Sequence, residues 1–485
     1  MNKGRVLVLV HNLHQPDTFF NIGAGYLVSV LKQHGAMVDV FDMAIDNLDE
    51  SDLADYLQDN SYDIIGLGFL SARFRETVEP LCKVINQYKN NALLVLGCNG
   101  ASAIPEYTLK KTQADVICIG ESEETIIDLL NCKINSGDYS KVKGIAYWDN
   151  NKVKINIRRK PIKNLDIIPF PHWSSFNMQK YTTNIKLALM EDNDKCFPMV
   201  STRGCTNACT FCYRMCRGVR ARSIDNVIEE MKILNQEYLV NYFFFFDELW
   251  IYNKLRVFDF AKALEKNNLN IKFNINARVD LIDEDIIKCL KDFGCVFLNF
   301  GFEASQDNIL REMKKNTTVE MNYRAAEMAY KYDIGMGINV LWGFKNDDEI
   351  TLRKNADFVK QFSKFDQIRT VRPVTSYPGS ELYYQALREG KLKDDDDFFN
   401  KFKNSDLITV NFTDLPLEEC YRLLYEVNKE LVLFHYEHTN QDWDAAWKII
   451  NGFKNLYEGK NFKFRGARSD TTNADKRKIT RMKGI

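Results

Sequence analysis

The chain has 485 residues, 45% of them hydrophobic and 27% charged, which is typical of a folded globular protein with a substantial core. Lysine and arginine number 65 and aspartate and glutamate 66, so the net charge of −1 gives no electrostatic case for nucleic acid or a membrane surface. No signal-peptide pattern or apolar run of transmembrane length is present, and twelve cysteines without a secretory context favour a reducing, cytoplasmic location.

The first 150 residues alternate short apolar runs with helical patterns. Residues 6–10 form an unbroken Val/Leu run, typical of a strand buried on both faces. The pattern continues with helices at 23–34 and 77–88 and from 124, and with strands at 37–41, 64–70, 93–96 and 116–119. This order predicts a Rossmann-like, doubly wound parallel sheet, which binds ligands beyond the carboxyl ends of its strands.

A hairpin and a proline-rich connector follow the first sheet. Strands are expected at 144–148 and 152–157, joined by the turn residues Asp149, Asn150 and Asn151. Pro169 and Pro171 favour an extended linker. We therefore expect a first domain at 1–150 and a linker at 151–195.

A second series of strands and helices occupies residues 196–385. Strands are expected at 197–201, 242–246, 271–276, 296–302, 337–342 and 368–375, with helices between them. Six strands in this order predict a parallel, curved sheet, a partial (β/α)6 barrel whose active site lies at the carboxyl ends of the strands. Residues 386–485 are expected to form a helical cap, with helices at 416–438 and 443–457 and a basic tail.

Three cysteines follow the first strand of this second series. Cys205, Cys209 and Cys212 have the spacing C-x3-C-x2-C. Thiolates bind iron–sulfur clusters, and three of them would leave one iron of a [4Fe–4S] cluster open. A zinc site with Cys216 as fourth ligand remains an alternative, as do inert thiols.

Both halves of the chain resemble the family of radical-SAM enzymes with a cobalamin-binding domain, of the class B methyltransferase type. In the first half the resemblance rests on the segments 21–27, 97–102 and 115–123; the Asp-x-His-x-x-Gly signature of His-ligated corrinoid domains is absent. In the second half it rests on the cysteine motif with Phe211 as its aromatic residue, on the segments 301–305 and 313–315, and on the closing turn at 377–382.

The resemblance implies three sets of site residues. Cys205, Cys209 and Cys212 would bind a [4Fe–4S] cluster. Contacts to S-adenosylmethionine are expected from Phe211, Asp247, Glu248, Asn276, Glu303 and Ser305. Contacts to cobalamin are expected from Asn12, His14, Ser71, Gly97, Asn99, Ser102, Gly120 and Glu121. For several of these a simpler role competes, since Glu303 could cap the next helix and the glycines could serve tight turns.

The family implies a radical reaction in which a 5′-deoxyadenosyl radical abstracts hydrogen from an unactivated carbon and methylcobalamin supplies a methyl group. A rearrangement, cyclisation or oxidation by the same radical is the alternative, and a zinc or nucleic-acid binding module is the non-enzymatic one. The expected partners are a small-molecule or peptide substrate and an electron donor such as flavodoxin or ferredoxin, and a monomer is expected.

Overall fold

The structure is a computed structural model that describes residues 3–12, 18–185, 187–439 and 441–464. The chain forms two compact units. The first contains the chain as far as Asn184 together with two later segments, Tyr213–Asn226 and Tyr377–Ser380. The second contains Ile185–Cys212, Val227–Ser376 and the chain from Glu381 onward.

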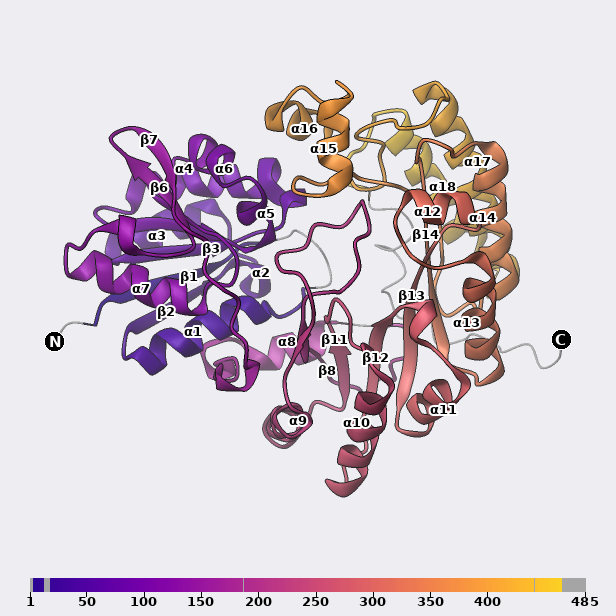
Figure 1. Cartoon of the computed structure of the whole chain (residues 1–485), viewed down its shortest axis with the longest axis horizontal. Helices are drawn as coiled ribbons and strands as arrows, with labels where there is room; N and C mark the ends of the chain where they lie inside the picture. Colours follow the sequence, from indigo (N-terminus) through magenta and orange to yellow (C-terminus); the bar gives the residue numbers. More distant parts are fainter. Residues whose placement is uncertain (1–2, 13–17, 186, 440, 465–485) are drawn as a thin grey trace. The chain divides into compact units, whose positions relative to one another are not determined.

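A seven-stranded sheet in the order β2-β1-β3-β4-β5-β6-β7 forms the centre of the first unit (Figure 1). Its five parallel strands are β1 (Arg5–Val10), β2 (Met37–Asp42), β3 (Ile64–Gly68), β4 (Leu93–Gly97) and β5 (Val116–Cys118). In chain order, β2 lies on one side of β1 and β3 lies on the other. The strand order therefore reverses between β1 and β3.

Helices from the connections cover this sheet. They form two groups. In one, α1 (Ile22–His34) packs against α7 (Glu123–Ile134). In the other, α3 (Glu50–Asp59) packs against α4 (Glu79–Tyr88), which also contacts α6 (Pro105–Thr112). The shorter helices of this unit are α2 (Met43–Asp46) and α8 (Met178–Asn184). The predicted Rossmann-like, doubly wound sheet is confirmed.

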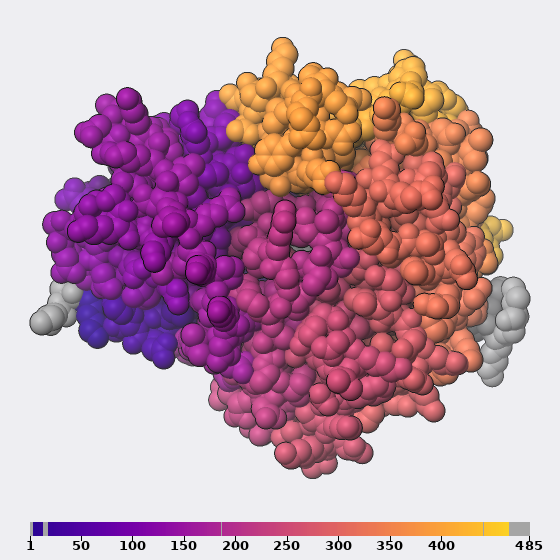
Figure 2. Space-filling view, viewed as in Figure 1, coloured from indigo at the N-terminus to yellow at the C-terminus, as the bar shows by residue number. Residues whose placement is uncertain are grey.

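The predicted hairpin is present and extends the first sheet. Strands β6 (Ile145–Asp149) and β7 (Lys152–Ile155) pair antiparallel, and β6 pairs antiparallel with β5. Asn150 and Asn151 both have positive φ, 49° and 61°, the left-handed conformation that a tight two-residue hairpin turn requires. Figure 2 shows the hairpin at the surface of the first unit. Residue 150 therefore lies inside a turn of the first sheet.

One segment differs from its prediction. No helix was predicted directly after the strand at 93–96, where the structure has the short helix α5 (Cys98–Ala103). Small side chains let this helix lie close to the preceding strand: a Cβ on Gly100 would lie 2.6 Å from the ring of Phe69. Close packing against Phe69, and not a tight turn, accounts for the glycine at position 100.

A six-stranded parallel sheet in the order β15-β14-β13-β12-β11-β8 forms the core of the second unit. Its strands are β8 (Cys196–Met199), β11 (Tyr242–Phe245), β12 (Lys272–Ala277), β13 (Cys295–Glu303), β14 (Gly335–Trp342) and β15 (Arg372–Pro373). Within this sheet the strands neighbour one another in chain order, which confirms the predicted partial (β/α)6 barrel. The last strand is shorter than expected.

Helices line the outer face of this curved sheet (Figure 1): α10 (Lys254–Lys266), α11 (Glu284–Asp292), α13 (Val319–Lys331) and α14 (Glu349–Phe362). Aromatic rings fill the space beneath α10, where Phe245, Trp250, Phe260 and Phe273 contact one another. The strand residues Phe245 and Phe273 thus pack against Trp250 of the following loop and Phe260 of α10. The other helices of the barrel are α9 (Ile224–Tyr238) and α12 (Asp307–Glu312).

The carboxyl-terminal part is helical, as predicted. It contains α15 (Glu381–Arg388), α16 (Asp395–Lys401), α17 (Leu417–Glu437) and α18 (Trp443–Tyr457). Helix α17 packs beside α14, and α18 packs on α17 around a small apolar cluster that includes Ile368. The basic tail predicted beyond residue 464 lies outside the described residues. Among the residues that the structure describes, no helix is both long and apolar enough to span a membrane.

Candidate functional site

The cysteine loop begins directly after β8, at the carboxyl edge of the curved sheet. Asp247, which follows β11, is buried and accepts hydrogen bonds from Ser201 N at 2.8 Å, from Ser201 Oγ at 3.3 Å and from Thr202 N. Burial raises the pKa of Asp247 to about 6, and the hydrogen bonds from Thr202 and Ser201 oppose that rise. The carboxylate expected to contact S-adenosylmethionine is thus occupied in fixing the start of the loop.

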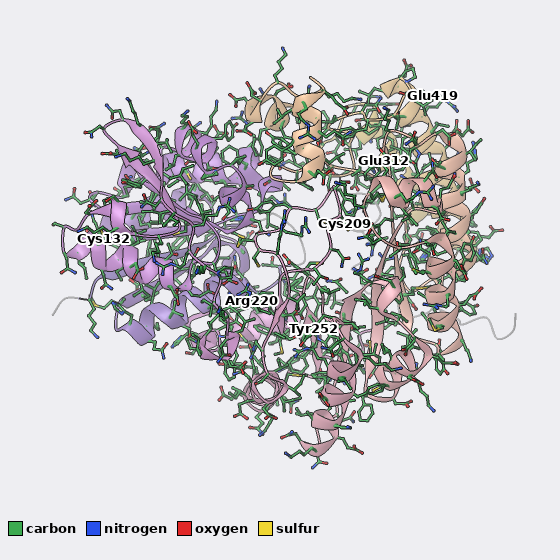
Figure 3. The ribbon with its side chains drawn as sticks, viewed as in Figure 1. Cys132, Cys209, Arg220, Tyr252, Glu312 and Glu419 are labelled. Carbon is green, nitrogen blue, oxygen red and sulfur yellow. The ribbon has the colours of Figure 1, made fainter. Side chains whose placement is uncertain are left out.

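The middle of the loop is held by its backbone. Thr210 N donates to Met313 O at 2.9 Å, and Thr210 O accepts from Leu382 N at 2.8 Å. Phe211 lies edge-on to Phe344, with 6.3 Å between the ring centroids. These contacts fix Cys209, labelled in Figure 3, and Cys212 on either side of Thr210 and Phe211.

The three thiols lie within electrostatic range of one another. Burial raises the pKa of Cys209, and the nearby Cys205 thiol adds to that rise. Burial and then Cys209 raise the pKa of Cys212 to about 12. Asn207 donates to Cys205 Sγ from its backbone N at 3.5 Å and from Nδ2 at 3.6 Å. Because metal binding deprotonates thiols, loading this loop must release protons.

The donor set suits an iron–sulfur cluster. It offers three soft thiols on one fixed loop, the ligand type and number that leave one iron open. In the described part of the chain no three His, Cys, Asp or Glu side chains converge on a closed metal site, so the thiols form a loop of donors rather than a preformed cage. Cys216, the alternative fourth zinc ligand, instead accepts a hydrogen bond from Arg220 Nη2 at 3.2 Å.

A buried ion pair lies next to the cysteines. Glu303 ends β13, and its carboxylate accepts a hydrogen bond from Lys315 Nζ at 2.6 Å, with the two side chains 10% and 6% exposed. Lys315 and Arg278 both lower the pKa of Cys209, against its burial. Arg278 also donates to Lys315 O at 2.7 Å. A positive charge thus lies close to the thiols, where it would stabilise their anionic form.

The backbone at Glu303 is unusual. Its φ is +66°, a conformation uncommon for a side chain of this size, and the pairing of β13 with β14 shifts register between Gly301 and Glu303. A Cβ on Gly301 would lie 2.4 Å from Glu303 Oε1 and 2.8 Å from Lys315 Nζ, so only glycine leaves room for the pair. Strained residues of this kind are concentrated at functional sites.

A row of amides crosses three strands on the polar side of the curved sheet. Asn339 Nδ2 donates to Asn299 Oδ1 at 3.0 Å, and Asn299 Nδ2 donates to Asn276 Oδ1 at 2.9 Å. Arg369 Nη1 reaches Asn339 Oδ1 at 3.4 Å. Of these four residues the sequence suggested only Asn276. Their placement on neighbouring parallel strands was the signal that could have revealed the others, since asparagine is rare in buried strands.

Two further residues expected to contact S-adenosylmethionine, Glu248 and Ser305, differ in their exposure and contacts. Glu248 is exposed, next to the buried Asp247. Ser305 is partly exposed, and its backbone N donates to Asn355 Oδ1 at 2.8 Å.

In the first unit, those expected cobalamin residues that the structure describes lie along the carboxyl edge of the parallel sheet. Ser102 is buried and joins α5 to β5, because its Oγ donates to Cys118 O at 3.4 Å and accepts from Gly120 N at 3.1 Å. Gly120 has φ +90°, and a Cβ there would meet nothing within 4 Å. The edge is therefore open at Gly120, as a site for a flat ligand over the strand ends requires.

The remaining members of this set vary in exposure. Asn12 is buried, and its Nδ2 donates to Asn47 Oδ1 at 3.4 Å. Gly97 precedes α5, Asn99 is partly exposed within it, and Ser71 begins a short 3-10 turn after β3. His14 lies outside the described residues.

A cavity opens beside Gly120 and Glu121. It is small, with a volume of about 40 Å³, and is lined also by Ile119, Arg158, Arg159, Lys160, Pro161, Tyr213, Met215 and Cys216. The carboxylate of Glu121 does not point freely into this space. It accepts hydrogen bonds from the Arg220 guanidinium at 2.6 and 3.0 Å and from Ile162 N at 2.9 Å.

Comparison with known proteins finds a match in each half of the chain. Residues 199–359 match the model of the radical SAM superfamily, and residues 12–130 match that of the B12 binding domain. The chain is 26% identical over 378 residues to the uncharacterized methyltransferase PH0819 of Pyrococcus horikoshii, covering 76% of this chain and 79% of the relative. It is 25% identical over 374 residues to the anaerobic magnesium-protoporphyrin IX monomethyl ester cyclase of Rubrivivax gelatinosus, covering 74% and 65%.

A solved structure shares the fold. The cobalamin-dependent S-adenosylmethionine radical enzyme OxsB with bound aqua-cobalamin matches with a TM-score of 0.64 at 20% identity. The match covers 80% of this chain and 55% of OxsB, so the chain spans about half the length of that protein.

Proposed function

We propose that this chain, a cobalamin-dependent enzyme of the radical SAM superfamily, transfers a methyl group to an unactivated carbon of its substrate. One observation carries the proposal: a single chain combines a fixed loop of three thiols with a Rossmann-like sheet that matches the B12 binding domain. The relative named as a methyltransferase, which is similar over most of both chains, supports it. When bound, the cluster and S-adenosylmethionine supply a hydrogen-abstracting radical, and cobalamin supplies a transferable methyl group.

The residues of the second unit would share three tasks. Cys205, Cys209 and Cys212 would bind the cluster. Lys315, held by Glu303, places a cation near the thiols, where it would attract the carboxylate of S-adenosylmethionine. Phe211 would border the adenine, as the family resemblance implies.

The amide row would orient the polar parts of the ligands. Asn276, Asn299 and Asn339 offer donors and acceptors along one face of three strands. Each amide is fixed by its neighbour, so the row is organised before a ligand binds. Such fixed polar groups favour a substrate with matching hydrogen-bonding groups, which fits a small molecule or a peptide side chain.

Ring formation without methyl gain is the second candidate. The relative from Rubrivivax gelatinosus is named a cyclase, and it matches this chain over a length similar to that of the methyltransferase. In either case a one-electron donor such as flavodoxin or ferredoxin would be needed to reduce the cluster.

The two candidates differ in the fate of the methyl group of S-adenosylmethionine. Protein reconstituted anaerobically with iron, sulfide and cobalamin would be incubated with reductant and S-adenosylmethionine deuterated in its methyl group. For the methyltransferase we expect the label on the protein-bound corrinoid and S-adenosylhomocysteine among the products, with Cys205→Ala unable to form 5′-deoxyadenosine. Formation of 5′-deoxyadenosine with no label on the corrinoid would contradict methyl transfer and favour the second candidate.

A further inference from the structure

The segment that follows the third cysteine belongs to the first unit. Tyr213 is bonded directly to Cys212, and Tyr213–Asn226 packs with the sheet that matches the B12 binding domain. The chain therefore passes from the thiol loop straight into contacts with the carboxyl edge of that sheet. Both ends of the stretch from Tyr213 to Arg220 are fixed there.

The far end, at Arg220, is fixed by a largely buried ion pair with two hydrogen bonds. Arg220 donates from Nη2 to Glu121 Oε1 at 2.6 Å and from Nη1 to Glu121 Oε2 at 3.0 Å, with the two side chains 17% and 11% exposed. Arg220 Nη1 also donates to Ile162 O at 2.6 Å, and Glu121 accepts from Ile162 N. Paired guanidinium–carboxylate hydrogen bonds fix orientation as well as distance. Arg220 is labelled in Figure 3.

The near end is fixed by packing. A Cβ on Gly379 would lie 2.5 Å from the ring of Tyr213 and 3.1 Å from Ala103 Cβ. Gly379 also has φ +88°, so the position is restricted to glycine by both conformation and space. Tyr213, the neighbour of Cys212, is thus held close to the turn at Gly379, which also lies against Ala103 at the end of α5.

The two anchoring points lie at the ends of neighbouring strands. Ala103 ends the helix that follows β4, and Glu121 follows Gly120 after β5. Both points lie at the carboxyl edge of the sheet, where open α/β sheets bind their ligands. Any ligand that orders them must also order the stretch from Tyr213 to Arg220, and with it the carboxyl end of the thiol loop.

We propose that Glu121 and Arg220 are positioning residues that couple corrinoid binding at the sheet edge to cluster binding by Cys205, Cys209 and Cys212. Binding linkage makes this coupling reciprocal: each cofactor tightens the binding of the other by the same factor. The inference rests on the two cofactors of the proposed function and not on methyl transfer. It assigns Glu121 to the ion pair with Arg220 rather than to a free contact with the corrinoid.

A binding cycle tests the coupling. The dissociation constant of hydroxocobalamin is measured by absorbance titration, under anaerobic conditions, for the cluster-free protein and for the cluster-loaded protein. We expect binding to be about fivefold or more tighter with the cluster present, the lower range of measured couplings. The reciprocal effect is measured by treating the cluster-loaded protein with increasing chelator, with and without cobalamin. Iron and sulfide analysis then shows how much cluster each sample retains.

Three variants locate the coupling in the ion pair. Arg220→Lys keeps the charge but loses the paired geometry, and Glu121→Gln keeps the shape but loses the charge. In each, and in the double variant, we expect the ratio of the two dissociation constants to fall to within about twofold of one. Arg5→Lys is the matched control, because Arg5 pairs with Asp39 at 2.7 Å at the amino end of the same sheet. It should keep the wild-type ratio.

Each result decides the matter. A wild-type ratio near one, or an unchanged ratio in Arg220→Lys and Glu121→Gln, overturns the inference even if the enzyme transfers methyl groups. Weaker cobalamin binding in Glu121→Gln alone, with Arg220→Lys like wild type, would make Glu121 a direct corrinoid contact and also overturn it. Should either variant fail to fold, Tyr213→Ala tests the near anchor by the same ratio. Absence of any cobalamin binding by wild-type protein would instead contradict the proposed function.

Discussion

Replacing Lys315 by methionine removes the positive charge of the buried pair while keeping most of the side-chain volume. The side chains of Lys315 and Glu303 are 6% and 10% exposed, so the remaining carboxylate would lie in protein without its partner. Breaking a buried pair on one side costs about 3–5 kcal/mol. Arg278, which donates to the Lys315 carbonyl, keeps a second cation nearby. We therefore expect the lower value, about 3 kcal/mol, from the range just given.

Thermal unfolding of the cofactor-free protein measures the effect. A loss of about 3 kcal/mol corresponds to a fall in Tm of roughly 5 °C for the second unit, because unfolding entropy is about 2.1 cal/mol/K per residue. The double variant Glu303→Gln with Lys315→Met removes both charges and should recover at least half of that fall. A fall below about 2 °C in the single variant, or a double variant as unstable as the single one, would refute the reasoning.

Three further predictions concern the thiols, the amide row and a buried histidine. Cys205→Ala should abolish iron and sulfide incorporation, whereas Cys216→Ala should retain both, as metal analysis after reconstitution will measure. Gly337→Ala should lower stability by about 1–3 kcal/mol, because its Cβ would lie 2.2 Å from Asn299 Oδ1, and thermal unfolding reads that loss. Burial lowers the pKa of His435 to about 4, so the unfolded chain binds the proton more tightly; stability should fall by about 2 kcal/mol between pH 7 and pH 5, and not in His435→Phe.

The contrary outcomes are equally specific. Loss of iron from Cys216→Ala would restore the hypothesis of a fourth thiol ligand. Wild-type stability of Gly337→Ala would mean that the amide row shifts without penalty. If His435→Phe also loses stability between pH 7 and pH 5, the loss is caused by other titratable groups.

The order of strands and helices was predictable because it depends on local patterns. The Val/Leu run of β1 and the aromatic run of β11 indicate strands whatever surrounds them, and the spacing of Cys205, Cys209 and Cys212 indicates soft metal ligands. Since the strands of the second sheet neighbour one another in chain order, the local order also settled its topology.

Partnerships between distant residues were not predictable. Nothing local marks Arg220 as the partner of Glu121, 99 positions earlier in the sequence, or Lys315 as a buried cation. The family resemblance implied that Asp247 contacts S-adenosylmethionine, and the buried carboxylate accepts hydrogen bonds from Ser201 N and Thr202 N. Side-chain partners depend on which loops meet, and that is decided by tertiary packing.

The first unit is built from three separate parts of the sequence. This limits how such enzymes can be divided or recombined. A fragment that ends at Asn184 would contain the whole seven-stranded sheet. It would nevertheless leave Glu121 and Ile162 without Arg220, and α5 without the packing of Gly379. Exchange of the corrinoid module between relatives would thus have to carry two short stretches of the radical module with it. In evolution, the two halves are expected to change together at those stretches and independently elsewhere.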